Sequence, residues 1–114
     1  MKIYKIAQMV QDVGRKQGLT LPETGYREQY VTIYRAVPKT MTTINHMDYV
    51  TRSLKFAKEH AEHMMWTTEE DNHVLSAMVK AKDVAEASNP GEYFYVGETP
   101  ANGRSIYEAK YENI

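Results

Sequence analysis

The 114-residue chain contains no cysteine. Disulfide frameworks and thiolate zinc sites therefore cannot form, and enzymes with a thiol nucleophile are excluded. The chain also lacks any stretch near the roughly 20 apolar residues that a membrane-spanning helix needs. Its first eight residues, MKIYKIAQ, hold no apolar core of a signal peptide. We therefore expect a cytoplasmic protein without a membrane segment.

Clusters of like charge are missing as well. The chain has 14 Lys and Arg and 15 Asp and Glu, which are interspersed and give a formal net charge of −1. A duplex-binding surface depends on clustered Lys and Arg that release counterions, so bulk electrostatics do not recruit nucleic acid. The composition, 42% hydrophobic and 25% charged, is that of an ordinary globular chain of one domain.

The apolar residues of the N-terminal segment recur at helical spacing: Ile3, Ile6, Ala7, Val10 and Val13. Gly14 and Gly18 mark the expected end of that helix. The stretch 17–25 is rich in turn residues and predicts a surface connection. We therefore predict a helix and connecting loop over residues 1–25 and a single compact unit over residues 26–114.

Five segments of the remaining chain are predicted to be strands. The strongest is YVTIYRAV at residues 30–37, which is β-branched and aromatic and is closed by Pro38. The others are residues 48–51, 73–80, 92–96 and 105–111. Loops are expected over residues 66–72 and 97–103, with a turn at Asn89-Pro90-Gly91.

One longer helix is predicted between the second and third of these strands. Leu54, Ala57, Ala61 and Met64 form one apolar face of a helix that runs from near Ser53 to near Met65. Either Thr51 or Ser53 can cap it through a hydroxyl oxygen. The order helix, two strands, helix, three strands favours an α+β fold over an alternating βαβ fold.

Three short segments place an arginine on a strand, hydroxyl residues at a strand-to-helix junction and a glutamate on a later strand: YRA at 34–36, DYVTRS at 48–53 and PGEY at 90–93. In this order the chain resembles, over residues 30–96, the small ADP-ribosyltransferase-like domains of bacteria and their phages. The resemblance implies a split, mixed β-sheet core with one main helix and an N-terminal helix. It also implies that NAD is bound as a substrate.

The resemblance assigns the first segment to the NAD phosphates or the adjoining ribose. A guanidinium presents a planar fork of donors that suits phosphate oxygens, so Arg35 is the expected phosphate ligand and catalytic partner, with Tyr34 beside it among the cofactor-binding residues. The alternative for Arg35 is a strand-end arginine paired with a surface carboxylate.

The second segment resembles the family's Ser-Thr-Ser element. The resemblance implies that the hydroxyls of Thr51 and Ser53 hold the nicotinamide ribose, although Arg52 replaces the central threonine. Helix capping is the alternative for either hydroxyl. Tyr49 and Phe56 are the aromatic residues expected to stack near nicotinamide, with a place in the core as the alternative.

Glu92 is the expected catalytic carboxylate. Cleavage between nicotinamide and ribose passes through an oxocarbenium-like state, which a carboxylate on the ribose hydroxyl stabilises; the same group can accept a proton from the acceptor. Glu98 is the second candidate. Pro90 stands where arginine-specific relatives carry Glu or Gln, so the acceptor is open among Asp, Glu, Asn, Ser, a nucleobase and water. An inactive domain that still binds NAD is the alternative within the family.

Other classes of function have weaker support in the sequence. His60 and His63 are three residues apart beside two glutamates, but the solvated face of a helix explains them better than a metal site does, so no metal is expected. The serines lack the spacing of a hydrolase nucleophile. Seven Met and nine Tyr favour a rival hypothesis: a non-catalytic phage inhibitor that binds a host protein through the segment 104–114. For the transferase we expect a phage-encoded effector that modifies a host protein in the bacterial cytoplasm.

Overall fold

The computed structural model describes residues 29–112. The predicted N-terminal helix and connection over residues 1–25 lie outside this range. Within it the architecture is α+β, as expected: strands paired in antiparallel fashion and one α-helix.

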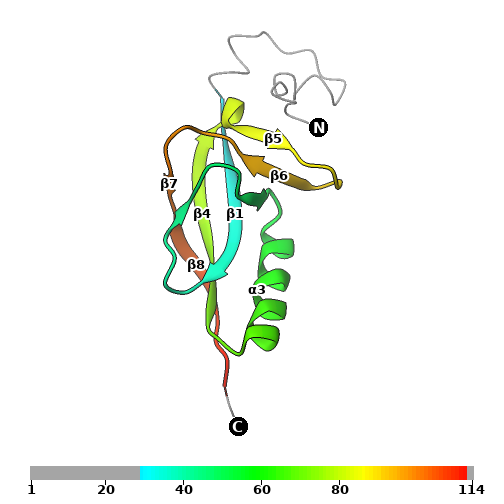
Figure 1. Ribbon diagram of the computed structural model, residues 1–114, viewed down its shortest axis with the longest axis vertical. Helices are drawn as coiled ribbons and strands as arrows, with labels where there is room; N and C mark the ends of the chain where they lie inside the picture. The colour runs from blue at the N-terminus through cyan, green and yellow to red at the C-terminus, as the bar shows by residue number, and fades with distance from the viewer. Residues whose placement is uncertain (1–28, 113–114) are drawn as a thin grey trace.

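The main sheet has six strands in the order β5-β6-β3-β1-β4-β8 (Figure 1). Their bounds are β1 Tyr30–Pro38, β3 Tyr49–Thr51, β4 Asn72–Lys80, β5 Val84–Glu86, β6 Glu92–Tyr95 and β8 Arg104–Ala109. Two further strands, β2 (Thr43–Ile44) and β7 (Ala101–Asn102), form a small second sheet.

The mixed sheet that the resemblance implied is not found among residues 29–112. Every pair of neighbouring strands there is antiparallel. Helix α3 (Leu54–Thr68) connects β3 to β4, and such a crossover joins strands that run in the same direction. Because β1 lies between these two strands and runs opposite to both, they do not pair with each other. The parallel strands β3 and β4 are therefore separated by β1, and each of them pairs with β1 in antiparallel fashion.

Strand β1 separates two hydrophobic cores because its side chains alternate between the faces of the sheet. Ile33 and Val37 are fully buried in the core that includes Ile44 of the small sheet. Ala36 belongs to the second core, on the face covered by α3, with Tyr34 packed at its margin. The β-branched residues Ile33 and Val37 therefore fill one side of the strand, and Tyr34 and Ala36 pack on the side covered by α3.

Helix α3 follows the predicted apolar stripe at Ala57 and Ala61, but its third buried residue is Met65, whereas the predicted Leu54 and Met64 are partly buried against the same core. Ala57, Ala61 and Met65 are its buried residues, and the small alanines let the helix axis lie close to the sheet. The sequence predicted an end near Met65, but the helix continues to Thr68. Glu69 ends it in the left-handed conformation with φ 58°, and its amide donates to the Met65 carbonyl at 2.8 Å.

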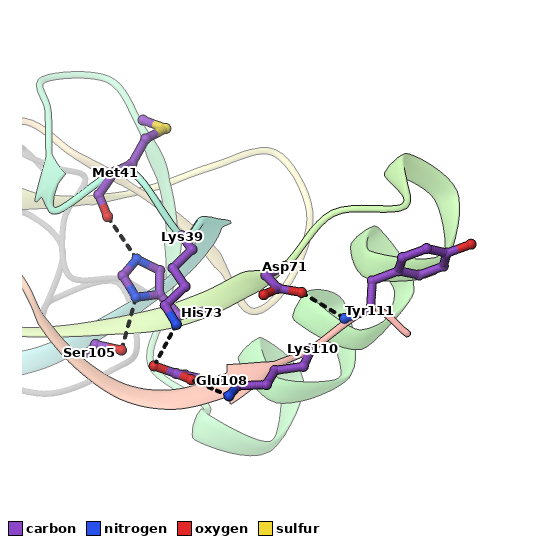
Figure 2. Close-up of polar contacts among 8 residues, drawn as sticks. All are labelled: Lys39, Met41, Asp71, His73, Ser105, Glu108, Lys110 and Tyr111. Atoms are coloured by element: carbon purple, nitrogen blue, oxygen red, sulfur yellow. Dashed lines mark hydrogen bonds and ion pairs between the residues drawn. The ribbon is translucent and has the colours of Figure 1, made fainter. Parts of the chain in front are cut away.

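Several short elements were not predicted from the sequence. Strand β7 lies in the expected loop 97–103, and Asn72 of the expected loop 66–72 already belongs to β4. Strands β2 and β5 and the 3₁₀ helix η1 (Ala81–Asp83) are also additional. The last strand ends at Ala109 rather than Tyr111, because the Tyr111 amide leaves the sheet to donate to Asp71 Oδ1 at 2.8 Å (Figure 2).

A buried histidine ties β4 to the segments around it (Figure 2). His73 is 4% exposed, and its Nε2 lies 2.7 Å from the Met41 carbonyl oxygen while its Nδ1 lies 2.9 Å from Ser105 Oγ. Since a carbonyl only accepts, Nε2 carries a proton. The ring therefore links the loop before β2 to β8 across the end of β4.

In the part of the chain that the structure describes, no helix has the length and apolar character to cross a membrane.

Candidate functional site

A cavity of about 260 Å³ lies between α3 and the sheet, where β1 and β3 come together. This volume is close to the lower end of the roughly 300–1,000 Å³ of small-molecule clefts. Six of the seven residues predicted for the site line it: Tyr34, Arg35, Tyr49, Thr51, Phe56 and Glu92. Ser53, the seventh, does not.

The floor of the cavity is a row of residues across three strands. Tyr34 on β1 is directly opposite Thr51 on β3, and Thr51 is directly opposite Glu92 on β6. Residues directly opposite in antiparallel strands project from the same face of the sheet. With neighbouring strands about 4.8 Å apart, the row places the phenol, the hydroxyl and the carboxylate within reach of one small ligand.

The opposite wall of the cavity is the first half of α3. Phe56 and His60 are four residues apart, hence on one face of the helix, and Ala57 lies between them. The ring of His60 is parallel to that of Phe56, with 6.2 Å between centroids and 9° between planes. Both side chains are exposed, Phe56 by 48%, so the two rings form a rim that an aromatic ligand can contact.

Arg35 is held at the start of β3 as well as lining the cavity. Its Nη1 donates to the Tyr49 carbonyl at 2.7 Å, and its Nε lies 3.6 Å from Asp48 Oδ2. The side chain is 26% exposed. The pairing with a carboxylate that was the alternative for Arg35 is therefore present, and it coexists with a position at the cavity.

The two hydroxyls of the strand-to-helix junction have different partners. Thr51 is 6% exposed, and its Oγ1 accepts from the Ser53 amide at 3.0 Å. Ser53 is the N-cap of α3, and its Oγ accepts from the Phe56 amide at 3.1 Å. The choice of cap that the sequence left open thus falls on Ser53, while Thr51 faces the cavity and fixes the turn.

Arg52, between these two residues in the sequence, is exposed and does not line the cavity. Its charge affects the phenol of Tyr93, which also lies outside the cavity lining. Burial raises the pKa of the Tyr93 phenol, and the positive charge of Arg52 acts in the opposite direction.

The aromatic residue Tyr49 forms the outer edge of the site. Its side chain is 55% exposed, and its ring packs against that of Phe94 with centroids 4.6 Å apart and planes tilted by 34°. Phe94 is the residue directly opposite on β6. Neither Tyr49 nor Phe56 is a core residue, so the core alternative for these two aromatics is wrong.

Glu92 begins β6 directly after the predicted turn. Its amide donates to the Asn89 carbonyl at 3.1 Å, and its Oε1 accepts from Asn89 Nδ2 at 3.2 Å. Gly91 adopts φ 85°, which favours glycine at that position. The half-buried carboxylate is therefore held by the turn and lines the cavity.

The second candidate carboxylate, Glu98, is elsewhere. It is exposed and lines a different cavity, of about 820 Å³, together with Asp83 and Tyr95. The structure therefore brings Glu92, and not Glu98, together with the other predicted residues.

His60 and Ala57 are site residues that the sequence analysis did not predict. Their signal was the helical spacing from Phe56, but the polar pattern around His60 favoured a solvated face. Within residues 29–112, no group of three or more His, Cys, Asp or Glu side chains could hold a metal ion. The pair of His60 and His63 therefore gains no third ligand there.

Comparison with protein-family models, with curated proteins and with solved structures finds no match to this chain.

Proposed function

We propose that this chain is an NAD-dependent mono-ADP-ribosyltransferase, which transfers ADP-ribose to a macromolecular acceptor and releases nicotinamide. The proposed acceptor is a host protein in the bacterial cytoplasm, with the chain as a phage-encoded effector; a nucleic-acid acceptor stays open. Glu92 and Arg35 are the proposed catalytic residues, and Tyr34, Tyr49, Thr51 and Phe56 the proposed NAD-binding residues. Ser53 is not among them, because it lies outside the cavity lining and its hydroxyl caps α3.

One observation carries the proposal. Tyr34, Thr51 and Glu92 form a single cross-strand row in a cavity that Arg35 and Phe56 also line. The three segments that hold these residues are far apart in the sequence. Residues chosen for a dinucleotide site are therefore neighbours in space, in a concave site of the kind that binds small molecules.

The proposed reaction breaks one bond and forms one bond. The bond between C1 of the ribose and the nicotinamide nitrogen breaks, and its electron pair leaves with nicotinamide, which becomes neutral. The acceptor nucleophile forms the new bond to C1 and loses a proton, which the Glu92 carboxylate accepts. Before that step the same carboxylate hydrogen-bonds a ribose hydroxyl and stabilises the positive charge that develops on the sugar.

The aromatic rim and the guanidinium have binding roles in this proposal. Nicotinamide is a flat ring, which the exposed faces of Tyr49 and Phe56 can stack against. A guanidinium carries five donors, so Arg35 can donate to a phosphate oxygen while it keeps its bond to the Tyr49 carbonyl.

The test is transfer of label from NAD labelled in its adenylate phosphate to macromolecules of a bacterial lysate. The wild type is compared with Arg35→Ala and Glu92→Ala, and Glu98→Ala is the matched control because Glu98 lies outside the cavity. The proposal expects transfer by the wild type and the control and loss in the other two. Transfer that survives Glu92→Ala would refute the assigned role, and no transfer by the wild type would refute the proposed activity.

A second candidate function is a non-catalytic inhibitor that binds a host protein. The observation that favours it is Trp66, which is 63% exposed at the end of α3, with its ring edge-on to Tyr111 at 5.7 Å between centroids. Trp and Tyr are common at the centres of interfaces. For this candidate the Trp66→Ala variant loses capture of a host protein, whereas Glu92→Ala keeps it.

A further inference from the structure

The guanidinium of Arg35 contacts Asp48 and Tyr49, two consecutive residues at the start of β3. The Tyr49 carbonyl accepts from Nη1 at 2.7 Å, and Asp48 Oδ2 lies 3.6 Å from Nε. Nε is buried and makes no hydrogen bond among residues 29–112. Within these residues, Nε therefore interacts with the protein through the ion pair with the Asp48 carboxylate.

Asp48 itself is fixed by the turn that precedes β3. Its Oδ2 accepts from the Asn45 amide at 2.8 Å, its amide donates to the Asn45 carbonyl at 3.0 Å, and its carbonyl accepts from the Tyr95 amide at 2.9 Å. Met47 in the same turn has φ 72°, a conformation that non-glycine residues rarely adopt. The carboxylate is thus part of a rigid turn tied to the end of β6, and its side chain is 23% exposed.

We propose that Asp48 is a positioning residue, which holds the Arg35 guanidinium at the cavity so that its remaining donors are directed to an anionic group of the ligand. This inference rests on the proposed function for the identity of that ligand, NAD. An arginine side chain has many rotamers in solution, and one that is already oriented loses less entropy when it binds a phosphate. The contact with Asp48 supplies that orientation before the ligand arrives.

The contact between Asp48 and Arg35 can also oppose the binding of a phosphate. A carboxylate beside a guanidinium competes with a phosphate for the same positive charge, so it weakens the pure charge attraction. If orientation dominates, removal of the Asp48 charge weakens binding; if competition dominates, removal strengthens it. The sign of the effect on NAD affinity therefore decides between the two.

The variant for the test is Asp48→Asn, which keeps an oxygen for the Asn45 amide and removes the charge that faces Arg35. Asp71→Asn is a matched control, because Asp71 also accepts a backbone amide, that of Tyr111, at 2.8 Å (Figure 2). Neither Asp71 nor Tyr111 lines the cavity. Both substitutions remove one negative charge and preserve one similar hydrogen bond.

Two measurements on the full chain separate the two hypotheses. The first is the solvent exchange of the Arg35 Nε–H proton by NMR without NAD, which we expect to be about tenfold faster in Asp48→Asn than in the wild type and in Asp71→Asn. The second is the dissociation constant for NAD, which we expect to rise about fivefold in Asp48→Asn alone, the equivalent of one partly exposed ion pair.

Each outcome has a definite meaning. Unchanged exchange, or NAD affinity in Asp48→Asn that is equal to or higher than that of the wild type, would overturn the positioning role. If the wild type binds no NAD, the proposed function fails, and the exchange measurement alone then decides whether Asp48 holds Arg35.

Discussion

Tyr34 on β1 lies directly across from Thr51 on β3, and this is the register pair through which β1 and β3 meet. By contrast, β1 pairs with β4 along its whole length, from Tyr30 to Pro38. The pairing between β1 and β3 is therefore much shorter than the pairing between β1 and β4. The cavity lies at the joint between β1 and β3, with Thr51 bonded to the next element through its hydroxyl and Tyr34 beside the helix-covered core.

The N-cap of α3 should contribute measurably to stability. Ser53→Ala removes the oxygen that accepts from the Phe56 amide, and we expect the free energy of unfolding in urea to fall by about 1 kcal/mol. Thr67→Ala is the control, because the Thr67 hydroxyl donates to the Met64 carbonyl in the last turn and caps no amide. An equal loss in both variants would contradict the capping role.

The buried histidine makes a second stability prediction. In the neutral ring, Nε2 donates to the Met41 carbonyl, so Nδ1 accepts from the Ser105 hydroxyl. Ser105→Ala leaves that buried nitrogen without its donor, and we expect a loss of about 1 kcal/mol in the free energy of unfolding. Ser88→Ala, at an exposed loop residue, should change it by less than about 0.5 kcal/mol. No loss in Ser105→Ala would show that the hydroxyl is dispensable.

The carboxylate of Asp83 makes a prediction about pH. Burial, and to a lesser extent the charge of Glu98, raise its pKa above the roughly 3.9 of a solvated aspartate, while Lys82 and Lys80 act in the opposite direction. The folded chain then holds this proton more tightly than the unfolded chain does. The contribution of Asp83 to the free energy of unfolding therefore falls as the pH rises from below 3.9 through its folded-state pKa.

Asp83→Asn removes this titration. We expect the variant to gain stability relative to the wild type between pH 3 and pH 7. The measurement is the free energy of unfolding of both proteins in urea at the two pH values. A difference that is constant with pH, or that shifts toward the wild type, would show that Asp83 pays no desolvation cost when it ionises.

The main elements were predictable because their patterns are long and local. The run at residues 30–37 is rich in β-branched and aromatic residues, and the stripe of Leu54, Ala57, Ala61 and Met64 has a clear helical period. Strands β2 and β7 have two residues each and pair across a large sequence separation, Thr43 with Asn102. Periodicity needs more residues than that to give a signal, so tertiary contact alone defines them.

The candidate site was predictable as a set of residues, but its contacts were not. Six of its residues were named from their order in the chain, yet nothing local indicates that Asp48 faces Arg35. That contact depends on the turn at Asn45 and Met47 and on its attachment to Tyr95. His60 was predicted to face solvent because its neighbours in the sequence are polar. In the structure it lies on the helix face beside the buried stripe, where it lines the cavity. A polar pattern does not distinguish a residue at a cavity from one in open solvent.

The proposed transferase activity can be tested through the release of nicotinamide from NAD by Glu92→Gln. This substitution keeps an acceptor for Asn89 Nδ2 and removes the negative charge at the cavity; Glu98→Gln is the matched control. The account predicts release by the wild type and the control, and a fall of at least about 10²-fold in Glu92→Gln with an unchanged free energy of unfolding. No release by the wild type, or equal release by Glu92→Gln and the wild type, would contradict it.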